Sequence, residues 1–369
     1  MNISFGRGNG KNSLMGGILF GGGLFFGSFV LLWWNEGNAV AQFRTIDDLE
    51  ANTVEVSDTE IDSALHGMPV YLSAGADTEV ELKDEVFDVS QVALRLRRIA
   101  EMYQWEEDED RDSDTDRVTY SYDRVWSQKR IDSGGFNDKS KKNPGSMPYR
   151  TENWIPGLVT LGAVRTLPKF LIEDLDEFEA LDVEGAEPEI EGLKRNGGGF
   201  YLGGNPGSPE IGDVRISFKV VLPGVVSLIA AQRMEGFERW KSPRTEREIH
   251  KIMHGFQTKE AIIQKLVNEA RLQMWLIRGG GFLAMFIGLL VLTRPITMLA
   301  RWIPLLGSMV QSGVAVVAFL VAGILSLTTV VVAWIAHRPM VGGVLLVVVA
   351  GLVYLLVVRV RKGKREEVG

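Results

Sequence analysis

The sequence predicts a membrane protein with four transmembrane α-helices and a large α+β extracytoplasmic domain, mainly antiparallel sheet, between helices 1 and 2. First, four apolar runs each approach the roughly 20 residues that a helix needs to cross a bilayer core of about 30 Å. Second, residues 35–275 hold 29 of the 40 Lys and Arg and 45 of the 47 Asp and Glu. Third, this middle stretch contains several short runs of alternating apolar and polar residues, which are typical of half-buried strands.

The chain divides into eight predicted segments. They are a cytoplasmic tail (1–13), transmembrane helix 1 (14–34), a periplasmic or lumenal α+β domain (35–275), transmembrane helix 2 (276–293), a cytoplasmic interfacial loop (294–309), transmembrane helix 3 (310–336), transmembrane helix 4 (340–358) and a basic cytoplasmic tail (359–369). Backbone amides find no partner in lipid, so the apolar runs must be helical despite their many valines.

The first apolar run is predicted to be a retained helix. The small residues at 39–41 also fit a signal-peptide cleavage site, but the run has about 21 residues and signal cores are roughly half that length. Its glycines include two Gly-x-x-x-Gly spacings, Gly17 to Gly21 and Gly23 to Gly27. This spacing lets another helix approach closely, so these four glycines are candidate helix-packing and oligomerisation residues. The competing interpretation is that glycines are simply common in membrane helices.

Basic residues set the predicted orientation. Arg7, Lys11, Arg294, Arg301 and the basic run at 359–365 all fall on one side of a four-span topology. The positive-inside rule makes that side cytoplasmic and puts residues 35–275 on the opposite side. That domain has a charge difference of −16, so it would repel nucleic acid. The chain has no cysteine, which excludes disulfides and thiolate sites.

Several elements are predicted inside the domain. They are strands at 68–73 and 85–89, a long β-hairpin joining 92–105 to 118–126, a helix at 169–181, a strand at 213–220 with a partner strand at 225–232 after a Pro-Gly turn, and a helix at 259–275 with Thr258 as its N-cap. The last helix is predicted to run without a break into transmembrane helix 2.

No motif in the sequence points to catalysis, a cofactor or a metal. Asp110, Asp112 and Asp114 alternate as in an EF-hand, but the glycine and glutamate that such a loop needs are missing, so a solvated hairpin tip is preferred. His250 and His254 could share a helix face, yet no third ligand follows. No Asp or Glu lies in the four spans, which argues against a coupled transporter.

Motifs along nearly the whole chain resemble the transmembrane protein 43 (LUMA) family. The resemblance is carried by segments 35–37, 94–105, 120–122, 142–147, 205–206, 212–218, 285–286, 292–294 and 338–339. The motif residues are Asn35, Glu36, Gly37, Arg97, Arg98, Glu101, Tyr103, Trp105, Asn143, Pro144, Gly212, Asp213, Arg215, Arg294, Arg338 and Pro339. It implies a four-span protein with a large lumenal domain after the first span. Animal members resemble nuclear-envelope and endoplasmic-reticulum proteins that self-associate and organise partners at the lamina.

Together these features predict a non-enzymatic membrane scaffold that forms a homo-oligomer, organises membrane or envelope partners of unknown identity and responds to membrane stress. The alternative is an oligomeric channel or channel regulator. The absence of cysteine and of a glycosylation sequon in the domain fits a bacterial inner-membrane member. A eukaryotic member would be expected in the endoplasmic reticulum or inner nuclear membrane.

Overall fold

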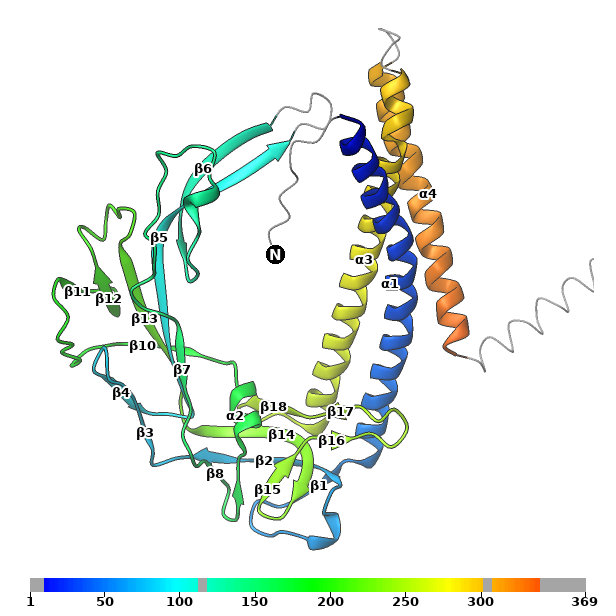
Figure 1. Cartoon of the computed structure of the whole chain (residues 1–369). Coiled ribbons are helices and arrows are strands. Elements are labelled where there is room, and N and C mark those ends of the chain that lie inside the picture. The colour runs from blue at the N-terminus through cyan, green and yellow to red at the C-terminus, as the bar shows by residue number, and fades with distance from the viewer. Residues whose placement is uncertain (1–9, 112–117, 301–306, 339–369) are drawn as a thin grey trace, which may run out of the picture. The chain divides into compact units, whose positions relative to one another are not determined.

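The structure is a computed structural model that describes residues 10–111, 118–300 and 307–338 (Figure 1). The chain forms two compact units. The helical unit contains the described parts of Met1–Glu50, Ser242–Arg247 and Ile263–Gly369, and the sheet domain contains Ala51–Lys241 and Glu248–Ile262. The predicted fourth span (340–358), the basic tail and the tip of the acidic hairpin lie outside the described residues.

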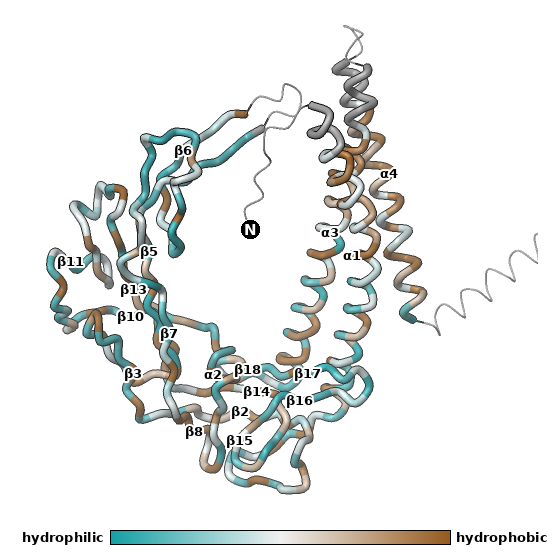
Figure 2. The backbone as a smooth tube through the Cα atoms, viewed as in Figure 1, coloured by the Kyte–Doolittle hydropathy of each residue, from teal (hydrophilic) through white to brown (hydrophobic). Residues whose placement is uncertain are grey.

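Three long helices build the helical unit: α1 (Gly10–Asn52), α3 (Lys259–Ala300) and α4 (Gly307–Ala336). Each is long and apolar enough to cross a membrane. They correspond to the predicted helices 1, 2 and 3, and hydrophobic residues gather along them in Figure 2. The chain is therefore an integral membrane protein with three such helices in its described part.

The helices extend beyond the predicted spans. Helix α1 continues to Asn52, although residues 35–52 were expected to open the sheet domain. Ala39, Ile46 and Leu49 are buried on one side of the helix in this extension, so burial of an apolar stripe sustains the helix. The predicted loop 294–309 is also wrong in part, because α3 continues to Ala300 and α4 begins at Gly307.

The start of α3 agrees with its prediction. The helix begins at Lys259, and the Thr258 hydroxyl accepts a hydrogen bond from the Ala261 amide at 3.2 Å. This is the bond expected of an N-cap threonine. From there the helix continues without a break into the apolar stretch.

The three helices pack around a small apolar core. Leu32 of α1, Met285 of α3 and Ala322 of α4 are buried at its centre. Tryptophans at one end of the apolar stretch come from all three helices: Trp33 and Trp34, Trp275, and Trp334. Indole rings prefer the membrane–water interface, so these residues mark where the helices leave the bilayer.

The sheet domain holds two seven-stranded sheets, and its main pairings are antiparallel, as predicted. One sheet has the order β15-β14-β2-β8-β9, with β1 beside β2 and β18 beside β14. Its strands are β1 (Val54–Glu55), β2 (Pro69–Asp77), β8 (Thr160–Leu161), β9 (Arg165–Thr166), β14 (Gly224–Arg233), β15 (Gly236–Glu238) and β18 (Lys251–His254). Among the described pairings, β1 with β2 is parallel.

The second sheet has the order β11-β12-β13-β5-β6, with β10 beside β13 and β7 beside β5. Its strands are β5 (Arg95–Arg111), β6 (Val118–Ser127), β7 (Glu152–Trp154), β10 (Glu179–Leu181), β11 (Leu193–Asn196), β12 (Gly199–Leu202) and β13 (Val214–Val221). Two short hairpins, β3 (Glu81–Asp84) with β4 (Val89–Val92) and β16 (Trp240–Lys241) with β17 (Glu248–Ile249), and helix α2 (Lys169–Asp174) complete the domain.

Several predicted elements of the domain are confirmed and others are wrong. The long hairpin is present as β5 and β6, paired from Met102 with Ser127 to Arg111 with Val118. The strand predicted at 85–89 is wrong, since residues 85–88 form the turn between β3 and β4. The helix predicted at 169–181 ends at Asp174, and Glu179–Leu181 forms β10 instead.

The predicted pairing of strand 213–220 with strand 225–232 is also wrong. Both strands exist as β13 and β14, but β13 pairs with β5, β10 and β12, and β14 pairs with β2, β15 and β18. Residues Val226–Gln232 are buried along the whole of β14, so this strand needs apolar cover on both faces. A hairpin partner binds the edge of a strand and does not cover its faces. The chain instead passes from the sheet that contains β13 to the sheet that contains β14.

Candidate functional site

A buried ion pair joins two of the membrane helices. Glu36 of α1 has 1 % of its side chain exposed, and both of its carboxylate oxygens accept hydrogen bonds from Arg278 of α3. The Nε–Oε1 and Nη2–Oε2 distances are 2.7 and 2.8 Å. The Arg278 guanidinium also lies 4.8 Å from the centre of the Trp275 ring. This two-bond geometry is the strongest form of an Arg–carboxylate contact.

The residues on either side of Glu36 also contact other helices. The Asn35 side-chain amide donates to the Met274 carbonyl oxygen of α3 at 3.2 Å. A Cβ atom built on Gly37 would lie 2.8 Å from the ring of His337, at the end of α4. The His337 ring centre is 5.6 Å from that of Trp33. Only glycine at position 37 therefore leaves room for this ring.

We call Asn35, Glu36, Gly37, Arg278 and His337 the polar junction. Three helices meet there at the level of the interfacial tryptophans, so the junction fixes their register where they leave the bilayer. Removing one member of a buried, doubly hydrogen-bonded ion pair is costly, because the charge of the remaining member is left without compensation. The arrangement suits mechanical coupling of the three helices.

The four candidate glycines of α1 separate into two groups. A Cβ atom on Gly21 would lie 2.8 Å from Val291 and 3.2 Å from the Gly288 carbonyl oxygen, so Gly21 serves close packing of α1 on α3. Gly17, Gly23 and Gly27 have no heavy atom within 4 Å of such a Cβ. The second Gly-x-x-x-Gly spacing therefore lies on a part of α1 that the described chain leaves uncovered.

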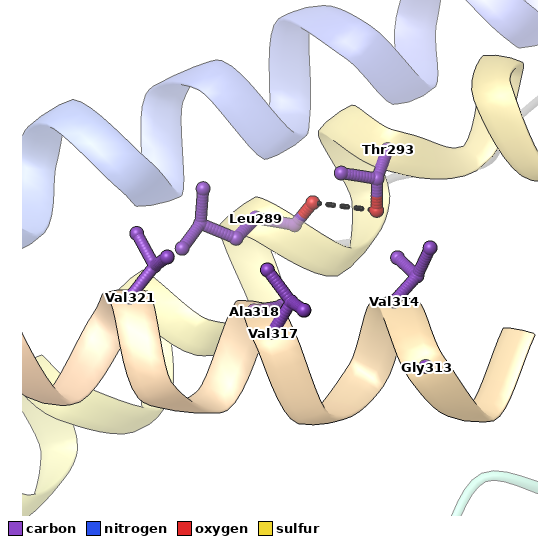
Figure 3. A pocket seen from close by; sticks show the side chains of 7 residues that line it. All are labelled: Leu289, Thr293, Gly313, Val314, Val317, Ala318 and Val321. Atoms are coloured by element: carbon purple, nitrogen blue, oxygen red, sulfur yellow. Dashed lines mark hydrogen bonds between the residues drawn. The ribbon is translucent and has the colours of Figure 1, made fainter. Parts of the chain in front are cut away.

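An apolar groove of about 430 Å³ lies between α3 and α4 (Figure 3). Leu289, Val314, Val317, Ala318 and Val321 supply its aliphatic surface, and Gly313 and Thr293 complete the lining. The Thr293 hydroxyl donates to the Leu289 carbonyl oxygen at 3.0 Å, so its hydrogen-bonding capacity is used within α3. None of these described lining residues is charged, so the lining is suited to hydrocarbon rather than to ions.

The motif residues of β5 alternate between the two faces of the strand. Arg98 is 3 % exposed and forms an ion pair of 2.6 Å with Asp84, which is 1 % exposed. Arg98 also donates to the Arg150 carbonyl oxygen at 3.0 Å. Arg97 lies on the other face, where its guanidinium is 4.3 Å from the ring centre of Phe178. Arg98 therefore anchors the core, and Arg97 covers an aromatic ring.

The next motif residues along β5 form a cluster with the neighbouring strands. Glu101 faces Arg215 of β13 in the strand register, and the two make an ion pair of 2.6 Å. The Arg215 guanidinium lies 4.6 Å from the centre of the Trp126 ring, which is 5.0 Å from that of Tyr103. These contacts are cross-strand pairs, which stabilise a sheet without implying chemistry.

Asn143 ends the pairing at this edge of β5. Its side-chain oxygen accepts from the Trp105 amide at 2.7 Å, and its side-chain nitrogen donates to the Trp105 carbonyl at 2.8 Å. Gly212 has φ +100°, which favours glycine, and a Cβ there would lie 3.3 Å from Pro144. These motif residues therefore close a strand and shape a turn.

Asp213 binds a buried tyrosine. The Tyr201 hydroxyl donates to Asp213 Oδ2 at 2.5 Å, and the Glu210 amide donates to the same oxygen at 2.8 Å. Burial, followed by this hydrogen bond, raises the pKa of Tyr201 well above its usual range. The tyrosine therefore stays protonated at neutral pH and acts as a fixed hydrogen-bond donor.

The proposed helix face for His250 and His254 is wrong, because both residues lie in or beside strand β18. His250 Nε2 lies 2.7 Å from Asp174, and His254 Nε2 lies 3.3 Å from the Leu222 carbonyl oxygen. In the part of the chain that the structure describes, no group of three or more His, Cys, Asp or Glu could hold a metal ion.

Two of the motif residues lack described side chains. Arg294 belongs to the backbone of α3, but its side chain is outside the described set, and Pro339 lies outside altogether. The Arg338 guanidinium is 5.2 Å from the centre of the Trp334 ring.

The sequence missed the pairing of Glu36 with Arg278, which are 242 residues apart. Glu36 is the charged residue nearest the end of the first apolar run, and Arg278 is the one nearest the start of the second. Their opposite charges were the sequence signal that could have suggested a pair. Pairing them required knowing that α1 and α3 lie side by side, with residues 35–36 level with residues 274–278.

Comparison with known proteins agrees with these motifs. A family profile described as transmembrane protein 43 matches residues 102–339. Transmembrane protein 43 of Homo sapiens is 31 % identical over 366 residues, covering 94 % of this chain and 90 % of the human protein. The Mus musculus protein is 30 % identical over 88 % of this chain and 85 % of its own length, and the Drosophila melanogaster homologue is 29 % identical over 89 % and 90 %. No solved structure matches the chain. The chain is a member of the transmembrane protein 43 family.

Proposed function

We propose that this protein is a non-enzymatic membrane scaffold that self-associates through α1 and holds its sheet domain outside the cytoplasm for other membrane or envelope proteins. The observation that carries the proposal is the Gly23–Gly27 spacing of α1, which the described residues leave uncovered. Gly21 packs against Gly288 within the chain, so the helix already uses one such contact to bring two backbones together.

The uncovered face of α1 has the composition of a helix–helix interface. Gly23 and Gly27 are exposed, and Phe20, Val30 and Trp34, which share their side of the helix, are 61, 70 and 56 % exposed. Glycines let a second backbone approach, and the flanking large side chains can pack around it. A second copy of α1 presents the same surface, as a symmetric dimer requires.

The mass of the purified protein in mild detergent tests the proposal. We expect an oligomer, and we expect Gly23→Leu with Gly27→Leu to shift it toward the monomer by blocking close approach. Gly22→Leu is the matched control, because Gly22 also has open space around it but points to a different side of α1. A wild-type monomer, or an unchanged mass in the double variant, would contradict self-association through this face.

We further propose that the membrane is a bacterial inner membrane and that the sheet domain is periplasmic. The distribution of basic residues supports the orientation, and the absence of cysteine and of a sequon in the domain supports the compartment. Labelling of single introduced cysteines in intact cells tests the orientation. Ion flux through liposomes tests the alternative of a channel, since a scaffold predicts no flux.

A further inference from the structure

A pocket of about 600 Å³ in the sheet domain carries a concentration of positive charge. It lies between the segment after β6, which supplies Gln128, Lys129 and Arg130, and the segment before β7, which supplies Ser146 and Arg150. Gly145, Met147 and Thr151 complete the lining, which therefore includes three cations and neither Asp nor Glu. The stretch 35–275 has a negative net charge, so the pocket is a locally positive site in an acidic domain.

Buried side chains of β5 hold one wall of the pocket in place. Gln104 is fully buried, and its amide donates to the Lys129 carbonyl oxygen at 2.9 Å. The oxygen of the same side chain accepts from the Ile131 amide at 2.8 Å. The backbone that carries Lys129 and Arg130 is therefore fixed from beneath.

The opposite wall is held from the same strand. Arg98, buried and paired with Asp84, donates to the Arg150 carbonyl oxygen. The Thr151 hydroxyl accepts from the Ala100 amide at 3.3 Å and contacts Gln128 Oε1 at 3.2 Å, which links the two walls. Both walls are therefore positioned before any ligand arrives, which lowers the ordering cost of binding.

The cationic side chains themselves remain available. Arg130 makes a solvent-exposed contact of 3.4 Å with Asp132, which contributes little. Among the described residues, the side chains of Lys129 and Arg150 have no ion-pair partner. Guanidinium and ammonium groups bind phosphate oxygens with charge-assisted hydrogen bonds, and the volume lies within the usual range for ligand sites.

We propose that this pocket, which we call the Lys129–Arg150 pocket, binds a phosphate-bearing anion. Lys129 and Arg150 supply the main contacts from the two walls, with Arg130, Ser146 and Gln128 as further donors. The phosphate could belong to a soluble phosphorylated compound or to an anionic phospholipid headgroup, and the two share the same recognition chemistry. The proposal stands apart from the scaffold function and does not depend on self-association.

Calorimetric titration of the full-length protein in neutral detergent with inorganic pyrophosphate tests the proposal. We expect saturable binding, weakened about tenfold by Arg150→Ala and by Lys129→Ala, as expected for the loss of one hydrogen bond to a charged group. Arg150→Lys should lose less, because it keeps the charge. Lys169→Ala is the control, since Lys169 is an exposed cation on α2 that is not part of the lining.

Two results would overturn the proposal: no saturable binding of pyrophosphate, or an equal loss of affinity in Lys169→Ala, which would indicate attraction to general surface charge. Competition with short-chain phosphatidylglycerol separates the sources. Displacement of pyrophosphate by this lipid, but not by phosphatidylcholine of the same chain length, would identify a headgroup. If pyrophosphate stays bound in the presence of phosphatidylglycerol, the phosphate that the pocket binds belongs to a soluble compound.

Discussion

The ion pair of the polar junction makes a quantitative prediction. In Arg278→Met the carboxylate of Glu36, 1 % exposed, keeps its position and loses both hydrogen bonds of its bidentate partner. Removing one member of a buried pair typically costs about 3–5 kcal/mol, because an uncompensated charge remains in a poorly solvated place. Arg278 is 18 % exposed, so water relieves part of this penalty and we expect about 3 kcal/mol.

The double variant Glu36→Met with Arg278→Met removes both charges and replaces them with apolar side chains of similar length. Such replacements are often neutral, so the double variant should be more stable than Arg278→Met alone. The two effects are therefore strongly non-additive, and a double-mutant cycle measures the coupling. Thermal or denaturant unfolding in mild detergent, followed by tryptophan fluorescence, is a suitable assay.

Arg271→Met is the matched control for this cycle. Arg271 lies on the same helix but is exposed, and we expect its loss to change the free energy of unfolding by less than about 0.5 kcal/mol. The reasoning would be refuted by a cost below about 1 kcal/mol for Arg278→Met, or by a double variant whose cost equals the sum of the two single costs.

Three further predictions concern other residues. Gly37→Val should destabilise the helical unit by about 1–3 kcal/mol, since its side chain would meet His337, and adding His337→Ala should recover part of that loss in the same unfolding assay. Tyr201→Phe removes a buried hydrogen bond and should cost about 1–3 kcal/mol at neutral pH. Because the pKa of Tyr201 is raised in the folded state, its contribution is complete below the unfolded pKa of about 10 and falls above it. Wild type should therefore lose stability more steeply than Tyr201→Phe as the pH rises above about 10, and parallel slopes would count against this role. Arg98→Met should leave the buried Asp84 carboxylate without its cationic partner and lower the free energy of unfolding by about 3–5 kcal/mol. Urea unfolding, followed by the circular dichroism signal of the β-sheets, measures this loss. A loss below about 1 kcal/mol would show that water reaches the Asp84 carboxylate.

Neighbouring side chains cover the rings of Phe170 and Phe178 in the sheet domain. The Phe178 ring is flanked by Arg95 and Arg97, at 4.8 and 4.3 Å from its centre. Phe170 packs edge-on against His250, at 4.8 Å between ring centres. Both rings are partly buried against the core, so they provide cover for it rather than a free docking surface.

Local patterns in the sequence were sufficient to identify many elements. The apolar runs of α1, α3 and α4 are long and nearly free of charge, and lipid leaves them only the helical conformation. The alternation in β6 and β13 and the N-cap at Thr258 were visible for the same reason, because each depends on residues close together in the chain.

Contacts between distant segments could be decided only by the tertiary structure. The sequence shows two equivalent Gly-x-x-x-Gly spacings, yet packing on Gly288 uses Gly21, and no described residue covers Gly23 or Gly27. Strands β13 and β14 are adjacent in the chain, yet burial of both faces of β14 places them in different sheets. The partner of Glu36 follows from the side-by-side packing of α1 and α3, and local spacing carries no information about that arrangement.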